Sequence, residues 1–182
     1  MEHEELKKMF ARVSIAARVK TSLVIVRGSQ RNAWTDGKKV YVTTSLIESL
    51  PEDQVAAAVA HELGHIIGRH VPDTEKALEE LRGRIYSDKK SEGIVSRAFI
   101  EGSIAVARQY RSRRHEFEAD SIGETLTKWA GYGSGKMSET LNEIASEHKE
   151  RSVLDSHPTT PERISKLQNQ PRKIRIRIIR KT

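Results

Sequence analysis

The sequence predicts an α+β fold, with a small antiparallel sheet near the N-terminus and a mostly helical remainder. Two observations lead to this prediction. Runs rich in β-branched residues occur at 23–26 and 40–44, and the turn dipeptide Asp36-Gly37 lies between them. Long stretches without proline follow later in the chain and have the length and composition of helices. We therefore expect a sheet first and helices after it.

The N-terminal part is predicted to contain a helix and three strands. An amphipathic pattern with three- and four-residue spacing predicts the helix at Leu6, Met9, Phe10, Val13 and Ala17. Residues 32–35 complete a sheet of about three strands. The open edge of such a sheet can bind an extended peptide as an added strand. The candidate substrate-binding residues on this edge are Asn32, Ala33 and Trp34.

The C-terminal two thirds are predicted to be helical. Val71-Pro72-Asp73 is expected to break the chain after the first of these helices. Residues 94–128 predict one long helix or two abutting helices. Further helices are expected at 138–151 and from Pro161 onward.

The 182-residue chain contains no cysteine. This composition excludes disulfides, thiolate metal ligands and a cysteine nucleophile, so a bound metal must be held by His, Glu or Asp side chains. The length indicates one domain, which we place at residues 1–170. The acidic N-terminus lacks an export signal and charges interrupt the apolar stretch 93–110, so we expect a cytoplasmic protein without a transmembrane helix.

The net charge of +7 is concentrated in residues 171–182, which hold six basic and no acidic side chains. Ile174, Ile176 and Ile178 alternate with basic residues there and predict a β-strand or tail. We favour an added edge strand; an autoinhibitory strand and a tail that binds polyanions are the alternatives. The chain has no RNA-binding signature or zinc knuckle, so nucleic acid is not an expected partner.

The sequence His61-Glu62-Leu63-Gly64-His65 carries the strongest chemical signal in the chain. It continues the strongly helix-prone residues 54–60 without a break. On a helix, two histidines four positions apart lie on one face, so both imidazoles can reach one metal ion. The Glu62 carboxylate is placed to take a proton from water without serving as a ligand. This motif predicts a hydrolytic metal site, against the alternative of coincidental histidines on a helix.

A second helical stretch offers a third ligand. Glu116 and Asp120 are four residues apart and share one helix face, whereas Glu118 points elsewhere. Two histidines and Glu116 would leave zinc one open position, as a catalytic site requires. Asp120 could then hydrogen-bond a ligating imidazole and fix its tautomer. The alternative for Glu116 is a solvent-facing residue in a charge pattern with nearby arginines.

Together these motifs resemble those of the gluzincin metallopeptidases of the HtpX, Ste-type prenyl-protease and OMA type, including their compact soluble minigluzincin forms. Besides the motif at 61–65, the ordered matches are Asn32-Ala33-Trp34 followed by a strand and Leu46, Glu116 to Asp120, and His157-Pro158 with Arg163 downstream. The resemblance implies a zincin-like fold, in which the sheet packs on the motif helix and the glutamate helix. Integral-membrane relatives carry apolar spans that this chain lacks.

The resemblance also implies roles for the site residues. Glu62 is the general base, and Asp120 orients a ligand. His157 lies near the metal, where it either stabilises the transition-state oxyanion or reaches the zinc and blocks it; a His-Pro pair can also be ordinary turn chemistry. The implied ligands of one zinc ion per chain are His61, His65 and Glu116.

The implied activity is that of a zinc-dependent endopeptidase, which hydrolyses peptide bonds of a peptide or protein substrate with a zinc-activated water. The resemblance to minigluzincins adds latency, because a terminal segment can occupy the cleft in such compact proteins. The alternative from another class is a non-catalytic binding module, stabilised by zinc but with a closed cleft. The oligomeric state is left open by the sequence.

The remaining charged residues and histidines have less definite expected roles. Arg163 either bridges to the active-site region or is an exposed helix arginine. The histidines expected at the surface are His3, His70, His115 and His148.

Overall fold

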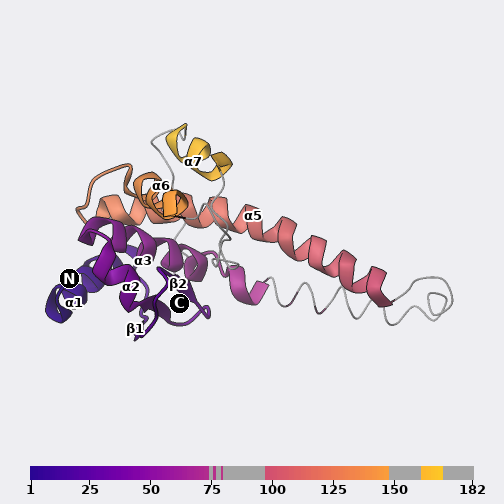
Figure 1. The fold of residues 1–182 in the computed structure, drawn as a ribbon, viewed down its shortest axis with the longest axis horizontal. Coiled ribbons are helices and arrows are strands. Elements are labelled where there is room, and N and C mark those ends of the chain that lie inside the picture. The colour runs from indigo at the N-terminus through magenta and orange to yellow at the C-terminus, as the bar shows by residue number, and fades with distance from the viewer. Residues whose placement is uncertain (74–75, 77–78, 80–96, 148–160, 170–182) are drawn as a thin grey trace.

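The computed structural model describes residues 1–73, 76, 79, 97–147 and 161–169, with the backbone alone at 97–112 and 144–147. The predictions for His157, for His148 and for residues 171–182 lie outside the described residues. The described part belongs to the predicted α+β class (Figure 1).

The elements follow one another in the predicted order, with helix α1 first, then three strands, then the remaining helices. The bounds are α1 His3–Ala17, β1 Leu23–Val26, β2 Ala33–Thr35, β3 Val40–Thr43, α2 Thr44–Ser49, α3 Glu52–Ile67, α5 Arg97–Trp129, α6 Lys136–Glu147 and α7 Pro161–Gln168.

Helix α3 lies at the centre of the described fold. It contacts α1, α2, α5 and α6 as well as strands β2 and β3 (Figure 1). Every residue from Val55 to His65 is buried. A helix that is apolar on all sides is stable in a core, and the alanines at 56–58 and 60 give α3 this character. The motif residues are therefore buried because the helix that carries them is surrounded.

The sheet has the expected three strands but is mixed rather than antiparallel, which corrects the prediction. Strand β2 pairs antiparallel with β3, whereas β1 pairs parallel with β3, in the order β1-β3-β2. Strand direction still alternates along the chain. Because β3 enters between the first two strands, its neighbour β1 runs the same way. Side-chain patterns locate strands but do not give their order in the sheet.

The loop between β1 and β2 crosses the C-terminal end of β3, where two threonines hold it. The Thr43 hydroxyl donates to the carbonyl oxygen of Gln30 at 2.7 Å and accepts from the amide of Asn32 at 2.9 Å. The amide of Gly28 donates to the Thr44 hydroxyl at 3.3 Å. This crossing is what brings β2 to the far edge of the sheet.

The predicted helices are found near their expected positions. Helix α1 buries one apolar face on the core, as its spacing predicts. Over the described residues, the later proline-free stretch forms one helix, α5, rather than two. Its N-terminal part projects beyond the other labelled elements, and its C-terminal part lies along α3 (Figure 1). Glu124 of α5 accepts hydrogen bonds from the amides of Gly135 and Met137 and so fixes the start of α6.

The break after α3 comes earlier than predicted. A turn at Gly68 and Arg69 ends the helix, and residues 70–73 are helical again. Arg69 adopts a left-handed conformation with φ of 55°. Proline is tolerated in the first turn of a helix, where its missing amide would have no intrahelical partner. Pro72 therefore lies within a new helix instead of ending the old one.

Glycines let α3 and α5 approach each other closely. A Cβ atom added to Gly64 would lie 2.8 Å from the carbonyl oxygen of Ala119, and one added to Gly123 would lie 3.0 Å from the amide nitrogen of His61. At Gly64 the obstacles are backbone atoms, which cannot move aside as a flexible side chain can; at Gly123 the Met137 Cε atom, at 2.9 Å, stands in the way together with the backbone of His61. The two helix backbones therefore touch beside the motif histidines.

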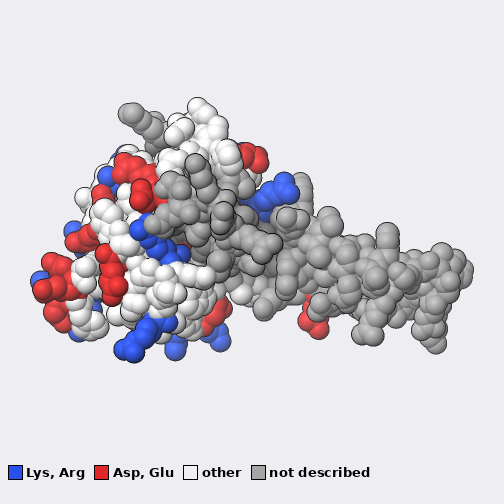
Figure 2. Space-filling view, in the orientation of Figure 1, with Lys and Arg blue, Asp and Glu red and all other residues white. Residues whose placement is uncertain are grey.

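Acidic and basic side chains are interspersed over the described residues on the face shown in Figure 2. The described part of this face has no continuous basic area. Within the described residues, no helix is long and apolar enough to cross a bilayer.

We expect Gly64→Ala to destabilise the protein by about 1–3 kcal/mol, the usual range for overpacking. The added methyl group would collide with the backbone of Ala119. This strain outweighs the roughly 0.5–1 kcal/mol that alanine normally gains over glycine inside a helix. Urea unfolding measures the change. Gly28→Ala is the matched control, because its methyl would meet only the Thr43 side chain, at 3.3 Å. A Gly64→Ala variant as stable as the parent would contradict the close contact.

Candidate metal centre

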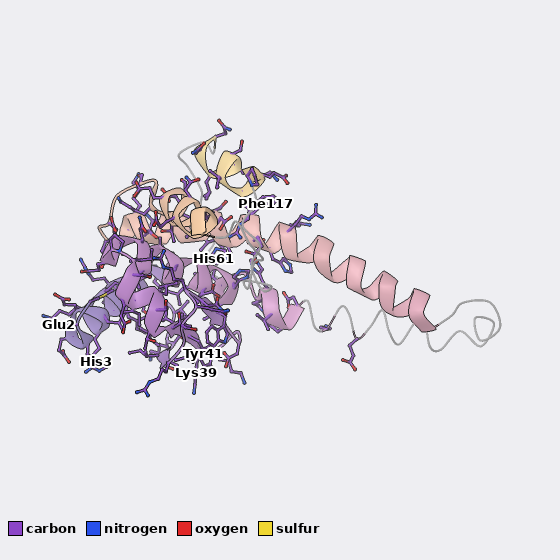
Figure 3. The ribbon with its side chains drawn as sticks, in the orientation of Figure 1. Glu2, His3, Lys39, Tyr41, His61 and Phe117 are labelled. Carbon is purple, nitrogen blue, oxygen red and sulfur yellow. The ribbon has the colours of Figure 1, made fainter. Side chains whose placement is uncertain are left out.

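The motif histidines lie one turn apart on α3, inside the protein. Both His61 and His65 are buried. His61 lies near the centre of the drawn side chains, whereas His3 lies at their edge on α1 (Figure 3). The Nε2 atoms of His61 and His65 are 3.1 Å apart. Both rings therefore direct one nitrogen to the same point.

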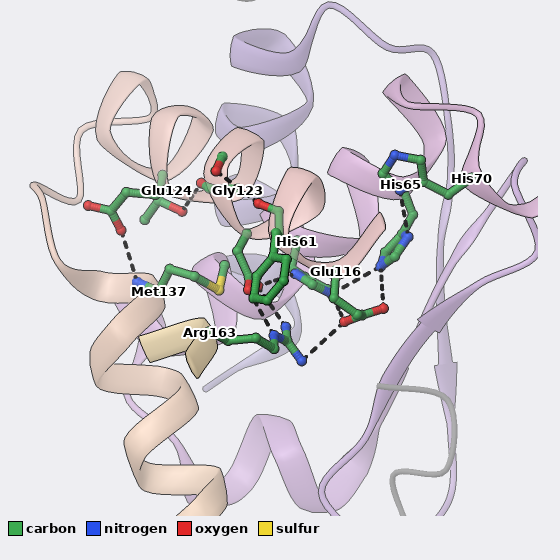
Figure 4. A network of polar contacts seen from close by, with 12 residues as sticks. His61, His65, His70, Glu116, Gly123, Glu124, Met137 and Arg163 are labelled. Carbon is green, nitrogen blue, oxygen red and sulfur yellow. Dashed lines mark hydrogen bonds and ion pairs between the residues drawn. The ribbon is translucent and has the colours of Figure 1, made fainter. Parts of the chain in front are cut away.

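Glu116 on α5 faces both imidazoles (Figure 4). Its Oε2 lies 3.3 Å from Nε2 of His61, and its Oε1 lies 3.3 Å from Nε2 of His65. Ligands of a tetrahedral zinc ion, with bonds of about 2.0–2.1 Å, stand roughly 3.3 Å apart. The observed separations fit such an ion, and the donor atoms of the three buried residues all lie within 4.8 Å of one another.

Asp120 lies on the Nδ1 side of the His61 ring, and Arg163 contacts Asp120. Oδ1 of Asp120 is 3.0 Å from Nδ1 of His61. Arg163, on α7, donates from Nε to Oδ2 of Asp120 at 2.8 Å and from Nη2 to Oδ1 at 2.6 Å. Its Nη1 also lies 3.1 Å from Oε2 of Glu116. With 3% of its surface exposed, Arg163 bridges to the site and is not the exposed helix arginine of the alternative.

The electrostatic field at this site favours positive charge. Burial lowers the pKa of His61, but Asp120 and Glu116 outweigh burial and raise that pKa to about 10. Burial likewise raises the pKa of Asp120, yet Arg163 and His61 bring it below its usual value. For Arg163, burial lowers the pKa and the surrounding carboxylates, Asp120 first, raise it above the usual value. A cation placed between the imidazoles would be stabilised by the same carboxylates.

Glu62 is buried beside the two histidines, with 2% of its surface exposed. Its charge is one of those that raise the pKa of Arg163. The Glu62 carboxylate therefore interacts electrostatically with the Arg163 guanidinium, and it belongs to the same cluster of buried charges.

His70 is buried rather than exposed, which corrects the prediction for it. Its Nδ1 lies 2.9 Å from Nδ1 of His65, and its ring stacks on that of His115 with centroids 4.3 Å apart. His115 is partly buried, and His3 is exposed as expected. The turn after α3 folds His70 back onto the helix. Gly68 was the sequence signal that could have indicated this turn.

Of the residues predicted to bind substrate, Ala33 and Trp34 lie on β2, at the edge of the described sheet, and Asn32 directly precedes this strand. Ala33 is buried, and the ring of Trp34 stacks on Tyr41 with centroids 5.3 Å apart. The carbonyl oxygen of Asn32 accepts from the amide of Thr43 at 2.9 Å. These contacts join the three residues to β3, and β2 itself packs against α3.

Comparison with known proteins adds two findings. Residues 1–170 match the sequence model described as Peptidase family M48. The chain is also 24% identical over 138 residues to the protein named Metalloprotease LoiP of Escherichia coli (strain K12), a match that covers 72% of this chain and 54% of the relative. The chain thus spans about half the length of the curated relative that it matches. Both findings agree with the resemblance to gluzincin metallopeptidases.

Replacing Arg163 by methionine should destabilise the protein by about 3–5 kcal/mol, because it removes one partner of a buried ion pair and leaves carboxylates without compensation. Urea unfolding in the presence of a chelator measures this, so that bound metal does not offset the lost charge. Lys166→Met, on the same helix, is the control. Lys166 pairs with Glu162 at 3.3 Å and lies 3.4 Å from the centroid of the Phe117 ring, with half of its side chain exposed. Its loss should cost about 1 kcal/mol, well below the effect of the Arg163 change. Equally small effects of both changes would refute the buried bridge.

Proposed function

The chain belongs to peptidase family M48, and from this membership we propose that it is a zinc-dependent endopeptidase of the gluzincin type. The observation that supports the proposal most is the convergence of donor atoms from His61, His65 and Glu116 in a buried site. Two imidazoles and one carboxylate suit zinc and leave it a position for catalysis. The chain has no cysteine that would compete as a ligand.

The buried side chains have different roles in the proposed hydrolysis. When bound, zinc supplies a polarising charge for the scissile carbonyl group and a water of lowered pKa, about 7. Glu62 accepts a proton from the attacking water and passes it to the leaving amine. Oδ1 of Asp120 lies 3.0 Å from Nδ1 of His61, and its negative charge favours the proton of that ring on Nδ1, which leaves the Nε2 lone pair for the metal.

Two further groups complete the proposed site. Arg163 pairs with the carboxylates of both Asp120 and Glu116, and its positive charge offsets part of the cost of burying them. His157, known here from the resemblance alone, either donates a hydrogen bond to the oxyanion or reaches the zinc and blocks it.

The proposed substrate is a peptide or protein bound in an extended form. The edge position of β2 supports strand addition next to Asn32, Ala33 and Trp34, because an edge strand has backbone groups that a further strand can pair with. We place the reaction in the cytoplasm, without nucleic acid as a partner.

The competing function is a zinc-stabilised binding module whose cleft stays closed. It uses the same ligands and differs from the enzyme in turnover alone. A latent enzyme is an intermediate case between an active enzyme and a binding module. It is inactive until the segment that covers its cleft is removed. Residues 171–182 are the candidate segment for this role, which is the alternative to the added edge strand favoured for them.

Glu62→Gln should lower kcat by at least about 100-fold, the lower limit of general acid–base contributions, while zinc stays bound. Cleavage of a fluorogenic peptide library and metal analysis measure the two quantities. Both are to be run on the full chain and on a chain ending at Gln170, because a latent enzyme turns over only in the shorter form. Glu48→Gln, an exposed glutamate on α2, is the control. Turnover in Glu62→Gln near that of the parent would contradict the general base; no turnover in either length of parent chain would favour the binding module.

A further inference from the structure

His70 contacts His65 on the side of the ring that faces away from Glu116. We propose that His70 is a positioning residue of the metal site, which fixes the orientation and tautomer of the His65 ring. This inference rests on the proposed function, because it takes His65 as a zinc ligand. Burial, contact geometry and the backbone around His70 support it independently.

The contacts around His65 define the direction of each hydrogen bond. Nε2 of His65 lies 3.3 Å from Glu116, so Nδ1 is the nitrogen that faces His70, at 2.9 Å. A ligating Nε2 offers its lone pair, which puts the proton of a neutral His65 on Nδ1. His65 then donates to Nδ1 of His70. The proton of His70 consequently lies on Nε2, 3.5 Å from Oε2 of Glu118.

The two motif histidines are thus held in the same way by different groups. Asp120 lies 3.0 Å from Nδ1 of His61, and His70 has the corresponding place at His65. Outer partners of this kind set the orientation of a ligating ring and raise its basicity. A neutral imidazole at this place adds no negative charge to a site that already contains several buried carboxylates.

The backbone is shaped to bring His70 back onto α3. A Cβ atom on Gly68 would lie 2.1 Å from Nε2 of His70, so the ring occupies space that a side chain at position 68 would fill. Arg69, between these residues, has a φ of 55°, which is unfavourable for a residue other than glycine. Such strain persists where surrounding contacts hold it in place. The contact between His70 and His65 is one that this turn makes possible.

The histidines here do not form a second metal site of their own. The rings of His70 and His115 are parallel, with an interplanar angle of 0°. Because imidazole lone pairs lie in the ring plane, stacked rings direct them side by side and not at one ion. The stack instead limits rotation of the His70 ring and so supports a fixed contact with His65.

Three substitutions of His70 separate its possible contributions. Asparagine places an amide atom where Nδ1 of histidine lies and can accept from His65. Glutamine places its amide near the position of Nε2 instead. Phenylalanine keeps the ring that stacks on His115 but has no acceptor. Zinc affinity is measured by competition with a chromophoric chelator, and the melting temperature of the metal-free proteins reports any loss of fold.

We expect His70→Asn to bind zinc within about threefold of the parent, and His70→Gln and His70→Phe to bind it roughly 10–100-fold more weakly, with metal-free melting temperatures alike. Equal affinities in the Asn and Phe variants, whether parental or equally weakened, overturn the proposal. If the Phe variant does not fold, the Asn and Gln variants decide by the same criterion. A parent protein that binds no zinc overturns the proposed function itself, so the two failures are distinguishable.

Discussion

The close contact between α3 and α5 is the constraint on which the site depends. Carboxylate side chains are short, so Glu116 and Asp120 can reach imidazoles on α3 only if the two backbones nearly touch. Gly64 and Gly123 allow this, because each leaves less than a normal Cβ distance to the facing backbone. Ala119, which Gly64 contacts, lies between the two acidic residues in the sequence. The packing of two helices therefore determines the spacing of the proposed ligands.

Burial of the site brings a second requirement, which is compensation of charge. Glu62, Glu116 and Asp120 are each at most 2% exposed, and isolated carboxylates at such depth would take up protons rather than stay ionised. Arg163 reaches Glu116 and Asp120 from α7, a helix far along the chain. The proposed metal ion would provide the remaining positive charge at the imidazoles. Closing the fold with α7 and forming the site are thus linked electrostatically.

Periodicity and motif spacing predicted the local features of this fold and not its distant contacts. The spacing of Leu6, Met9 and Val13 was sufficient for α1, and four-residue spacing was sufficient to place His61 with His65 and Glu116 with Asp120. Strand order was missed because it depends on a loop crossing the end of β3. His70 was missed because its burial depends on a turn with a left-handed residue, and neither role of Arg163 could be preferred because its partners lie on another helix.

The central claim is that His61, His65 and Glu116 together bind zinc, and metal analysis of the purified protein tests it most directly. The comparison uses the parent, Glu116→Gln and the control Glu139→Gln, an exposed glutamate on α6. We expect about one zinc per chain in the parent and the control, with zinc lost or weakly held in Glu116→Gln. A parent protein that contains no metal and does not take up added zinc would contradict it.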